Sequence, residues 1–126
     1  MIGLTYDTGA LLAAEARSFD VWTIHEDALK RELMPVVPAV ALAQAWRGGP
    51  QPVLSRFLRG CVVEQFAEHS SPRVGAALAR TRTRDVVDAA VVISALASGN
   101  AVVTSDPEDL RRLAEALGMK LLVHAI

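Results

Sequence analysis

Short apolar runs alternate with longer segments of helical periodicity along the whole chain, and this alternation constrains the fold more than any other feature. The short runs are apolar throughout rather than alternately polar, which is typical of parallel strands covered on both faces. Parallel neighbours need a long crossover connection, and the intervening helical segments supply it. The sequence therefore predicts an α/β fold, a three-layer α/β/α domain with a short parallel sheet of four or five strands.

Gly, Pro and helix-capping residues set the expected boundaries of these elements. The predicted strands are 2–6, 35–38, 61–63, 101–104 and 121–123. The predicted helices are 9–17, 22–33, 39–47, 52–58, 68–79 (with a true start close to Pro72), 85–97 and 107–117. No repeat, low-complexity tract or linker interrupts them, so we expect a single domain over 1–126.

The composition limits how this chain can bind nucleic acid. Hydrophobic residues make up 52% of the 126 positions and charged residues 21%, enough apolar surface for a real core. Lys and Arg number 13 against 14 Asp and Glu, so a general basic coat is absent. Nucleic-acid binding must then depend on a local patch or on metal ions. Aromatic residues are few, and we expect Trp22, Trp46, Phe57 and Phe66 to pack in the core.

The single cysteine, Cys61, excludes an internal disulfide and a Cys-rich zinc site. We expect no secretion signal in the first residues, because an acid interrupts them early and no basic segment precedes it. The longest uncharged apolar run, 89–97, is too short to span a bilayer. We therefore expect a cytoplasmic protein that is not in a membrane.

Three aspartates occupy places where an α/β sheet binds ligands. Asp7 follows the first predicted strand, Asp106 follows the strand 101–104, and Asp88 lies in the first turns of the helix 85–97. Ligands of such sheets bind beyond the carboxyl ends of the strands. Three carboxylates with no adjacent Lys or Arg repel one another, and Mg²⁺ or Mn²⁺ relieves that repulsion with the oxygen ligands it prefers. Such ions activate water for attack on a phosphodiester.

Helix capping is the alternative role for these acids. Asp7, Asp85 and Asp106 each precede a predicted helix, where Asp is a favoured cap, and capping and function are equally well supported for Asp7 and Asp106. Asp88 lies among apolar residues, where an unpaired buried acid is costly, so a functional role is favoured there unless it faces solvent.

The only dense basic stretch runs from Arg80 through Arg82 to Arg84, with Arg73 nearby. It directly precedes the helix that carries Asp88. Arg82 and Arg84 are therefore candidates for binding nucleic-acid phosphates at the rim of the site. A solvated loop is an equally good interpretation.

Other chemistries are disfavoured by what the sequence lacks. It contains no glycine-rich dinucleotide or P-loop motif. A phosphoacceptor receiver domain needs an Asp after its central strand, but Glu64 follows 61–63. The three histidines, His25, His69 and His124, are scattered, and we expect them at the surface or in packing rather than in metal-free acid–base cleavage.

Four segments, in order along nearly the whole chain, resemble the PIN-domain ribonucleases of the VapC toxin type. They are Leu4-Thr5-Tyr6-Asp7-Thr8-Gly9-Ala10-Leu11, the segment from Pro38 to Arg47, Asp85-Val86-Val87-Asp88-Ala89-Ala90, and the segment from Val102 to Leu110. Each motif is weak alone, and their order and spacing together are fairly specific.

The resemblance implies a Mg²⁺- or Mn²⁺-dependent endoribonuclease that leaves a 5′-phosphate and a 3′-hydroxyl. It implies Asp7, Asp88 and Asp106 as the metal-binding and catalytic acids, with Thr104 or Ser105 as an auxiliary polar group on the substrate side. It also implies the toxin half of a toxin–antitoxin pair, with a cognate antitoxin as partner. We expect a homodimer as well, and the apolar face of 22–33 is open to either a second copy or an antitoxin helix.

The family pattern usually has Glu at the position of Gln44. Glutamine keeps one carbonyl oxygen but loses the negative charge, which weakens attraction to a divalent ion. Asp85 is a candidate substitute, because residues three apart share a helix face. The alternative function is therefore a weakened or inactive PIN-like module that only binds RNA or an antitoxin.

Overall fold

A five-stranded sheet in which every neighbouring pair is parallel forms the centre of the computed structural model, which describes residues Met1–Ile126. The strand order is β3-β2-β1-β4-β5. The strands are β1 (Leu4–Tyr6), β2 (Val36–Pro38), β3 (Val62–Glu64), β4 (Ala101–Thr104) and β5 (Val123–Ala125). The predicted α/β class and the parallel sheet of four or five strands are confirmed.

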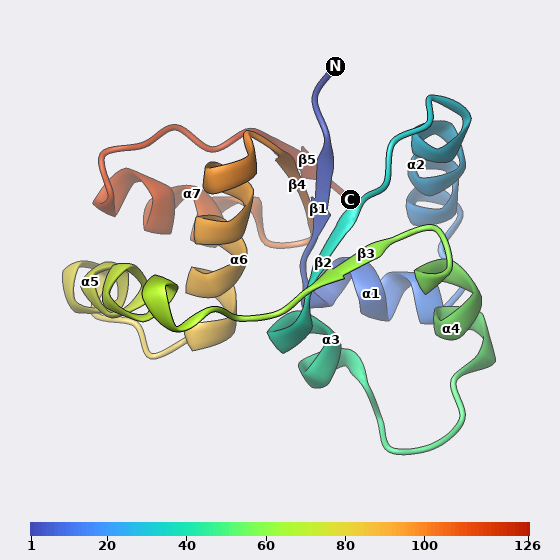
Figure 1. The fold of residues 1–126 in the computed structure, drawn as a ribbon, viewed down its shortest axis with the longest axis horizontal. Coiled ribbons are helices and arrows are strands. Elements are labelled where there is room, and N and C mark those ends of the chain that lie inside the picture. The colour runs from blue at the N-terminus through green and yellow to red at the C-terminus, as the bar shows by residue number, and fades with distance from the viewer.

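Helices cover the two faces of this sheet (Figure 1). They are α1 (Thr8–Glu15), α2 (Phe19–Lys30), α3 (Ala39–Ala45), α4 (Pro52–Leu58), α5 (Ser71–Thr81), α6 (Val86–Ser98) and α7 (Pro107–Ala116), with a short 3₁₀ turn at Glu68–Ser70. Helices α5, α6 and α7 pack together on one side, and α1, α2 and α4 lie on the other. Helix α3 contacts both α1 and α6. None of the helices combines the length and apolar character needed to cross a membrane.

The direction of strand addition reverses at β1. From β1 the chain builds outward to β2 and β3, then returns to the other side of β1 to place β4 and β5. The register pairs Leu4 with Ala101 and Tyr6 with Val103, so β1 and β4 end side by side. A reversal of this kind opens a crevice at the carboxyl ends of the two strands, where ligands of α/β sheets bind.

A group of buried aromatic rings anchors β1 to α2 and α4. His25 stacks on Phe57 with ring centroids 3.9 Å apart, and its Nδ1 lies 2.9 Å from the Tyr6 hydroxyl. Trp22 packs edge-on against Phe57. The prediction of core packing is therefore confirmed for Trp22 and Phe57, and the packing role expected for His25 is confirmed too.

The core prediction is wrong for Trp46 and Phe66, which are 41% and 39% exposed. Both lie outside the helices and strands, Trp46 just after α3 and Phe66 after β3. Their apolar character alone did not distinguish a core position from a loop at the surface.

The expectation that every strand is covered on both faces is wrong for β3. All three of its residues are exposed, Val62 at 43% and Val63 at 46%. Strand β3 is the edge of the sheet and pairs only with β2, so its apolar run is not matched by two covering layers. The last strand also begins later than predicted, at Val123, because Leu121 is buried ahead of it as part of the core.

Acid should destabilise the fold through His25. Burial, the largest effect, lowers its pKa below the usual 6.5. A folded-state pKa below that of the unfolded chain gives stability that is complete above pH 6.5 and is lost as pH falls through the lowered value. One such group contributes a slope of up to about 1.4 kcal/mol per pH unit.

Urea unfolding between pH 7.5 and 5 checks this. We expect the free energy of unfolding to fall more steeply in the wild type than in His25→Asn, which cannot gain the proton. His69→Asn, at an exposed position, should keep the wild-type slope. Equal slopes for the wild type and His25→Asn would contradict the assignment.

Candidate active site

The acidic residues singled out by the sequence all lie where β1, β4 and α6 meet the same edge of the sheet. Asp7 follows β1 and is the N-cap of α1, and Asp106 follows β4 and precedes α7. Asp88 is in the first turn of α6, behind its N-cap Asp85. The charges of Asp7, Asp85 and Asp106 each raise the pKa of Asp88. The fold therefore brings these four carboxylates, here called the acid cluster, within electrostatic reach of one another.

Asp7 is the most deeply placed member of the acid cluster, with 4% of its surface exposed. Its Oδ1 accepts a 2.8 Å hydrogen bond from the Ala10 N–H, so the capping interpretation is confirmed. Burial raises the pKa of Asp7, the charge of Asp106 adds to that effect, and hydrogen bonds from Thr104, Ala10 and Gly9 oppose it. A carboxylate has about four acceptor sites, so these three hydrogen bonds leave Asp7 with about one site for a ligand.

Asp85 and Asp88 form a pair at the start of α6. Asp85 Oδ1 accepts a 2.9 Å hydrogen bond from the Asp88 N–H, which confirms Asp85 as a cap. Burial, followed by the charge and hydrogen bonding of Asp85, raises the pKa of Asp88 to about 7. Asp88 is half-buried rather than enclosed by its apolar neighbours, since it lies in the first turn of α6 at the edge of the sheet.

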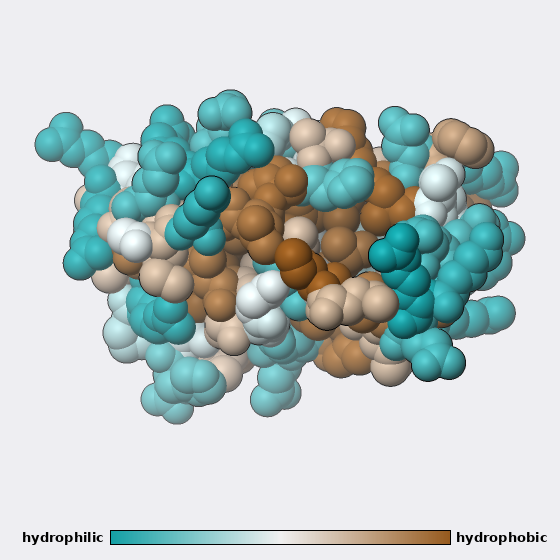
Figure 2. All heavy atoms as spheres, turned by 90° about the horizontal axis from the view of Figure 1, so that it is seen from above, coloured by the Kyte–Doolittle hydropathy of each residue, from teal (hydrophilic) through white to brown (hydrophobic).

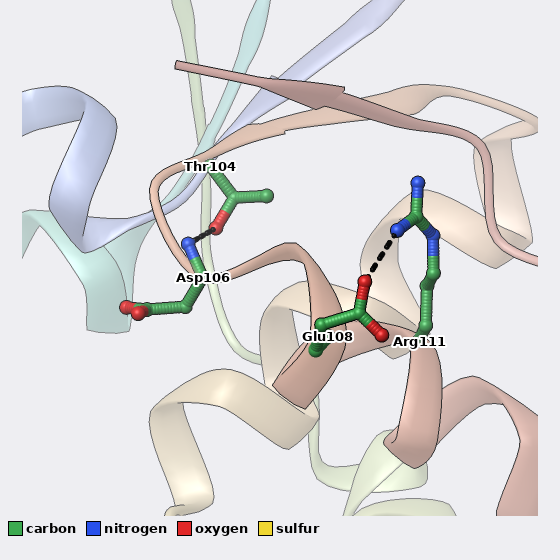
Figure 3. A network of polar contacts seen from close by, with 4 residues as sticks. All are labelled: Thr104, Asp106, Glu108 and Arg111. Atoms are coloured by element: carbon green, nitrogen blue, oxygen red, sulfur yellow. Dashed lines mark hydrogen bonds and ion pairs between the residues drawn. The ribbon is translucent and has the colours of Figure 1, made fainter.

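Asp106 differs from the other two caps because its own side chain caps nothing. Its backbone N–H donates to Thr104 Oγ1 at 2.9 Å, which shapes the turn between β4 and α7. Figure 3 shows its carboxylate pointing away from the ion pair between Glu108 and Arg111. The capping interpretation is therefore wrong for the side chain of Asp106, which is exposed and makes no hydrogen bond or ion pair within the protein.

Thr104 joins the two strand-end acids. Its hydroxyl accepts from the Asp106 N–H and hydrogen-bonds the Asp7 carboxylate, lowering the pKa of Asp7. The residue is fully buried, so the expected contact with substrate is wrong for Thr104. It is an auxiliary group that positions Asp7 and Asp106. Ser105 is exposed and stays a candidate for substrate contact.

Gly9 allows the first turn of α1 to lie directly against the turn after β4. A Cβ at this position would stand 2.5 Å from Ser105 Oγ and 3.4 Å from Asp7 Oδ1. The sequence analysis did not single out this glycine. Its place two residues after a strand-end Asp was the only available signal.

No basic side chain neutralises the acid cluster. The ion pairs of the structure are Arg31–Asp27, Arg111–Glu108 and Arg112–Asp109, all elsewhere on the surface. Oxygen-only donors suit a hard divalent cation, and a bound cation would favour the ionised forms of Asp7 and Asp88, whose pKa values are raised. As the side chains stand, no three His, Cys, Asp or Glu residues converge on one point that would hold an ion. The donor chemistry fits Mg²⁺ or Mn²⁺, and chelation requires side-chain rotation, which the unbonded Asp106 carboxylate is free to make.

Gln44 lies beside this cluster, on α3. Thr8, the residue after Asp7, donates a 2.7 Å hydrogen bond from its hydroxyl to Gln44 Oε1. The sequence analysis identified Gln44 but missed Thr8, because their contact depends on how α1 packs on α3.

The arginines before α6 have different surroundings. Arg80 donates to the Ala116 carbonyl at 2.9 Å and so ties α5 to α7. Arg82, in the left-handed conformation with φ of 58°, and Arg84 are exposed and form no ion pair. Arg82 and Arg84 therefore remain available to an anionic ligand.

Comparison with known proteins shows a shared fold. No protein-family model and no curated protein matches this chain. A chain of VapBC2 from Rickettsia felis, crystallised bound to a DNA fragment from its promoter, matches with a TM-score of 0.75 and 16% identity, covering 100% of this chain and 99% of that one. PAE2754 from Pyrobaculum aerophilum matches with a TM-score of 0.62 and 19% identity, covering 97% and 83%. The chain thus has a PIN-like α/β fold, as the resemblance in its sequence predicted.

Asp88 should make the protein less stable as pH rises. Its pKa of about 7 in the fold exceeds the 3.8 of an ordinary Asp, so the stability it supports at low pH is lost as pH rises through 7. Because about half of the group remains exposed, the loss is at most about 2 kcal/mol. Asp88→Asn should therefore be more stable than the wild type at pH 8 and similar to it at pH 4.

Urea unfolding at the two pH values measures this difference. The exposed Asp20 provides the control, since Asp20→Asn should show no such gain at pH 8. Adding Mg²⁺ or Mn²⁺ at pH 8 should stabilise the wild type more than Asp88→Asn, because a ligand stabilises the state that binds it. A variant no more stable than the wild type at pH 8 would remove Asp88 from the cluster.

Proposed function

We propose that this protein is a Mg²⁺- or Mn²⁺-dependent endoribonuclease, the VapC-type toxin of a toxin–antitoxin pair. The observation that carries the proposal is the acid cluster, placed at the strand-order reversal and left without a neutralising Lys or Arg. Uncompensated carboxylates of raised pKa are costly for a fold, and they are typical of a functional site. The order of the matching sequence motifs and the likeness in fold to a VapBC2 chain support the same assignment.

Asp7, Asp88 and Asp106 would hold the cation. When bound, a divalent ion lowers the pKa of coordinated water and neutralises charge on the phosphodiester. Asp7 offers a rigid, capped carboxylate, and Asp106 offers an unbonded one. Thr104 links the two acids, since its hydroxyl accepts from the Asp106 N–H and hydrogen-bonds the Asp7 carboxylate. The family resemblance implies products with a 5′-phosphate and a 3′-hydroxyl.

The RNA chain would run past the start of α6. Arg82 and Arg84 directly precede Asp85 and Asp88 in the chain, so cations for the backbone phosphates lie next to the acids. Arginine forms two-pronged hydrogen bonds with phosphate. The small net charge of −1 makes such a local patch necessary, because the protein as a whole does not attract RNA.

An antitoxin partner is the second part of the proposal. Hydrophobic side chains gather on the end of the molecule that bears the N-terminus, opposite the acid cluster (Figure 2). A pocket of about 650 Å³ lies there, lined in part by Ile2, Ile24 and Leu33. Exposed apolar surface that is gathered on one face is typical of interfaces with other proteins. The VapBC2 chain of similar fold was crystallised with its promoter DNA, and a complex of toxin with antitoxin is the arrangement we propose for this chain, with a homodimer of the toxin within it.

The alternative is a PIN-like module that binds RNA or an antitoxin without cleaving. It is favoured by Gln44 in place of an acid and by the lack of three converging ligands. Cleavage of RNA that depends on added metal would exclude it.

Removal of either the metal or one acid should abolish cleavage. Purified protein, free of antitoxin, would be incubated with a mixed RNA pool in Mg²⁺, Mn²⁺ or EDTA. We expect cleavage in either metal and none in EDTA. Asp106→Asn should lose activity by at least about 100-fold, since even the residues that only orient metal ligands are worth 10- to 100-fold.

The position of Asp106 makes this a clean test. Its side chain makes no bond within the protein and repels Asp7 and Asp88, so Asp106→Asn should fold and be no less stable than the wild type. Asp109→Asn, one turn further along α7 on an exposed side chain, is the matched control and should stay active. Full cleavage in EDTA, or full activity of Asp106→Asn, would refute the proposed function.

A further inference from the structure

The side chain of Gln44 has one polar group engaged and one free. Its Oε1 accepts the Thr8 hydroxyl at 2.7 Å, and this is the only hydrogen bond the side chain makes. Gln44 is exposed, so its Nε2 amino group faces outward with two N–H donors and no protein acceptor. The atom suited to binding a cation therefore already accepts one hydrogen bond, whereas the atom suited to binding an anion makes none.

The neighbours of Gln44 fix where that donor lies. Thr8 is the first residue of α1 and directly follows Asp7, so the bonded carboxamide stands next to the deepest acid of the cluster. Helices α1 and α3 pack closely along this side, which limits how far the pair can separate. The carboxylates of the acid cluster therefore have a neutral donor beside them, on α3.

We propose, on the basis of the function proposed above, that Gln44 is a substrate-binding residue: held by Thr8, it donates from Nε2 to a phosphate oxygen of the RNA and does not ligate the cation. An N–H donor next to a phosphodiester stabilises it, whereas a carboxylate in the same place would repel it. Compared with a Glu at this position, Gln44 has one negative charge fewer. Metal binding is then left to Asp7, Asp88 and Asp106, and the RNA gains a hydrogen bond in return.

Two isosteric changes separate these roles. Gln44→Glu keeps the shape and replaces the N–H donors with charge. Thr8→Val keeps the shape of Thr8 but removes the hydroxyl that holds Gln44. Gln44→Ala removes the carboxamide altogether. Gln65→Glu, at an exposed position in the segment after β3, adds the same charge at the same edge of the sheet without contact to Thr8 and serves as the control.

Binding of Mn²⁺ alone, followed by electron paramagnetic resonance of the free ion, is the first measurement. We expect Gln44→Ala and Thr8→Val to match the wild type within about twofold, because neither removes a ligand. Gln44→Glu should bind Mn²⁺ about tenfold more tightly or bind a second ion, since a unit charge at close range is worth more than the 1.4 kcal/mol of a tenfold change even after screening. Gln65→Glu should change Mn²⁺ binding less than Gln44→Glu does.

Binding of a fluorescent single-stranded RNA pool is the second measurement, made both in EDTA and in Ca²⁺, with gels to confirm that the RNA is intact. Gln44→Ala should weaken RNA binding about two- to tenfold, the value of one hydrogen bond to a charged group. Thr8→Val should weaken it less, and Gln44→Glu at least as much as Gln44→Ala. Thermal unfolding of each variant checks that the fold is kept.

The outcomes separate this inference from the proposed function. If Gln44→Ala weakens Mn²⁺ binding as much as Asp106→Asn does, Gln44 is a ligand and the inference is wrong. If Gln44→Ala leaves RNA binding unchanged in both EDTA and Ca²⁺, the inference is also wrong. A wild type that binds no Mn²⁺ refutes the metal-dependent function instead, and the RNA measurement then still decides whether Gln44 contacts the substrate.

Discussion

The pairing of β1 with β4 is the constraint on which the rest of the site depends. These strands are distant in the sequence, and their register sets Tyr6 opposite Val103. The segments that follow the two strands therefore lie next to each other. Asp7 and the start of α1 follow β1, and Asp106 and the start of α7 follow β4. Had β4 joined the sheet at its other edge, beyond β3, the same residues would form two unrelated helix caps.

The aspartates of the acid cluster also have structural roles, and these roles explain why the fold tolerates them close together. Asp7 and Asp85 each cap a helix, so part of the cost of crowding negative charge is offset by satisfied backbone N–H groups at the helix starts. Asp106 has no such compensation from its own side chain, because Thr104 takes the turn-forming role. Capping and ligand binding are therefore not competing explanations in this protein. Asp7 caps α1 through Oδ1 and still has an acceptor site for a ligand.

Much of the architecture could be predicted from the sequence because apolar periodicity and capping residues act locally. The helix Pro52–Leu58 and the strand Ala101–Thr104 have the predicted bounds. Properties that depend on neighbours distant in the chain could not be predicted. The exposure of Val62 and Val63 follows from β3 being an edge strand, and the bond between Thr8 and Gln44 follows from the packing of α1 on α3. The burial of Thr104, which rules out its contact with substrate, likewise needed the folded sheet.

The close approach at Gly9 couples the two turns that carry Asp7 and Asp106. A methyl group at position 9 would stand 2.5 Å from Ser105 Oγ, so any larger residue must displace the Ser105 side chain. Ser105 directly precedes Asp106, and Gly9 lies two residues after Asp7. A substitution on either side of this single contact would therefore disturb both strand-end acids, although neither acid itself had been changed.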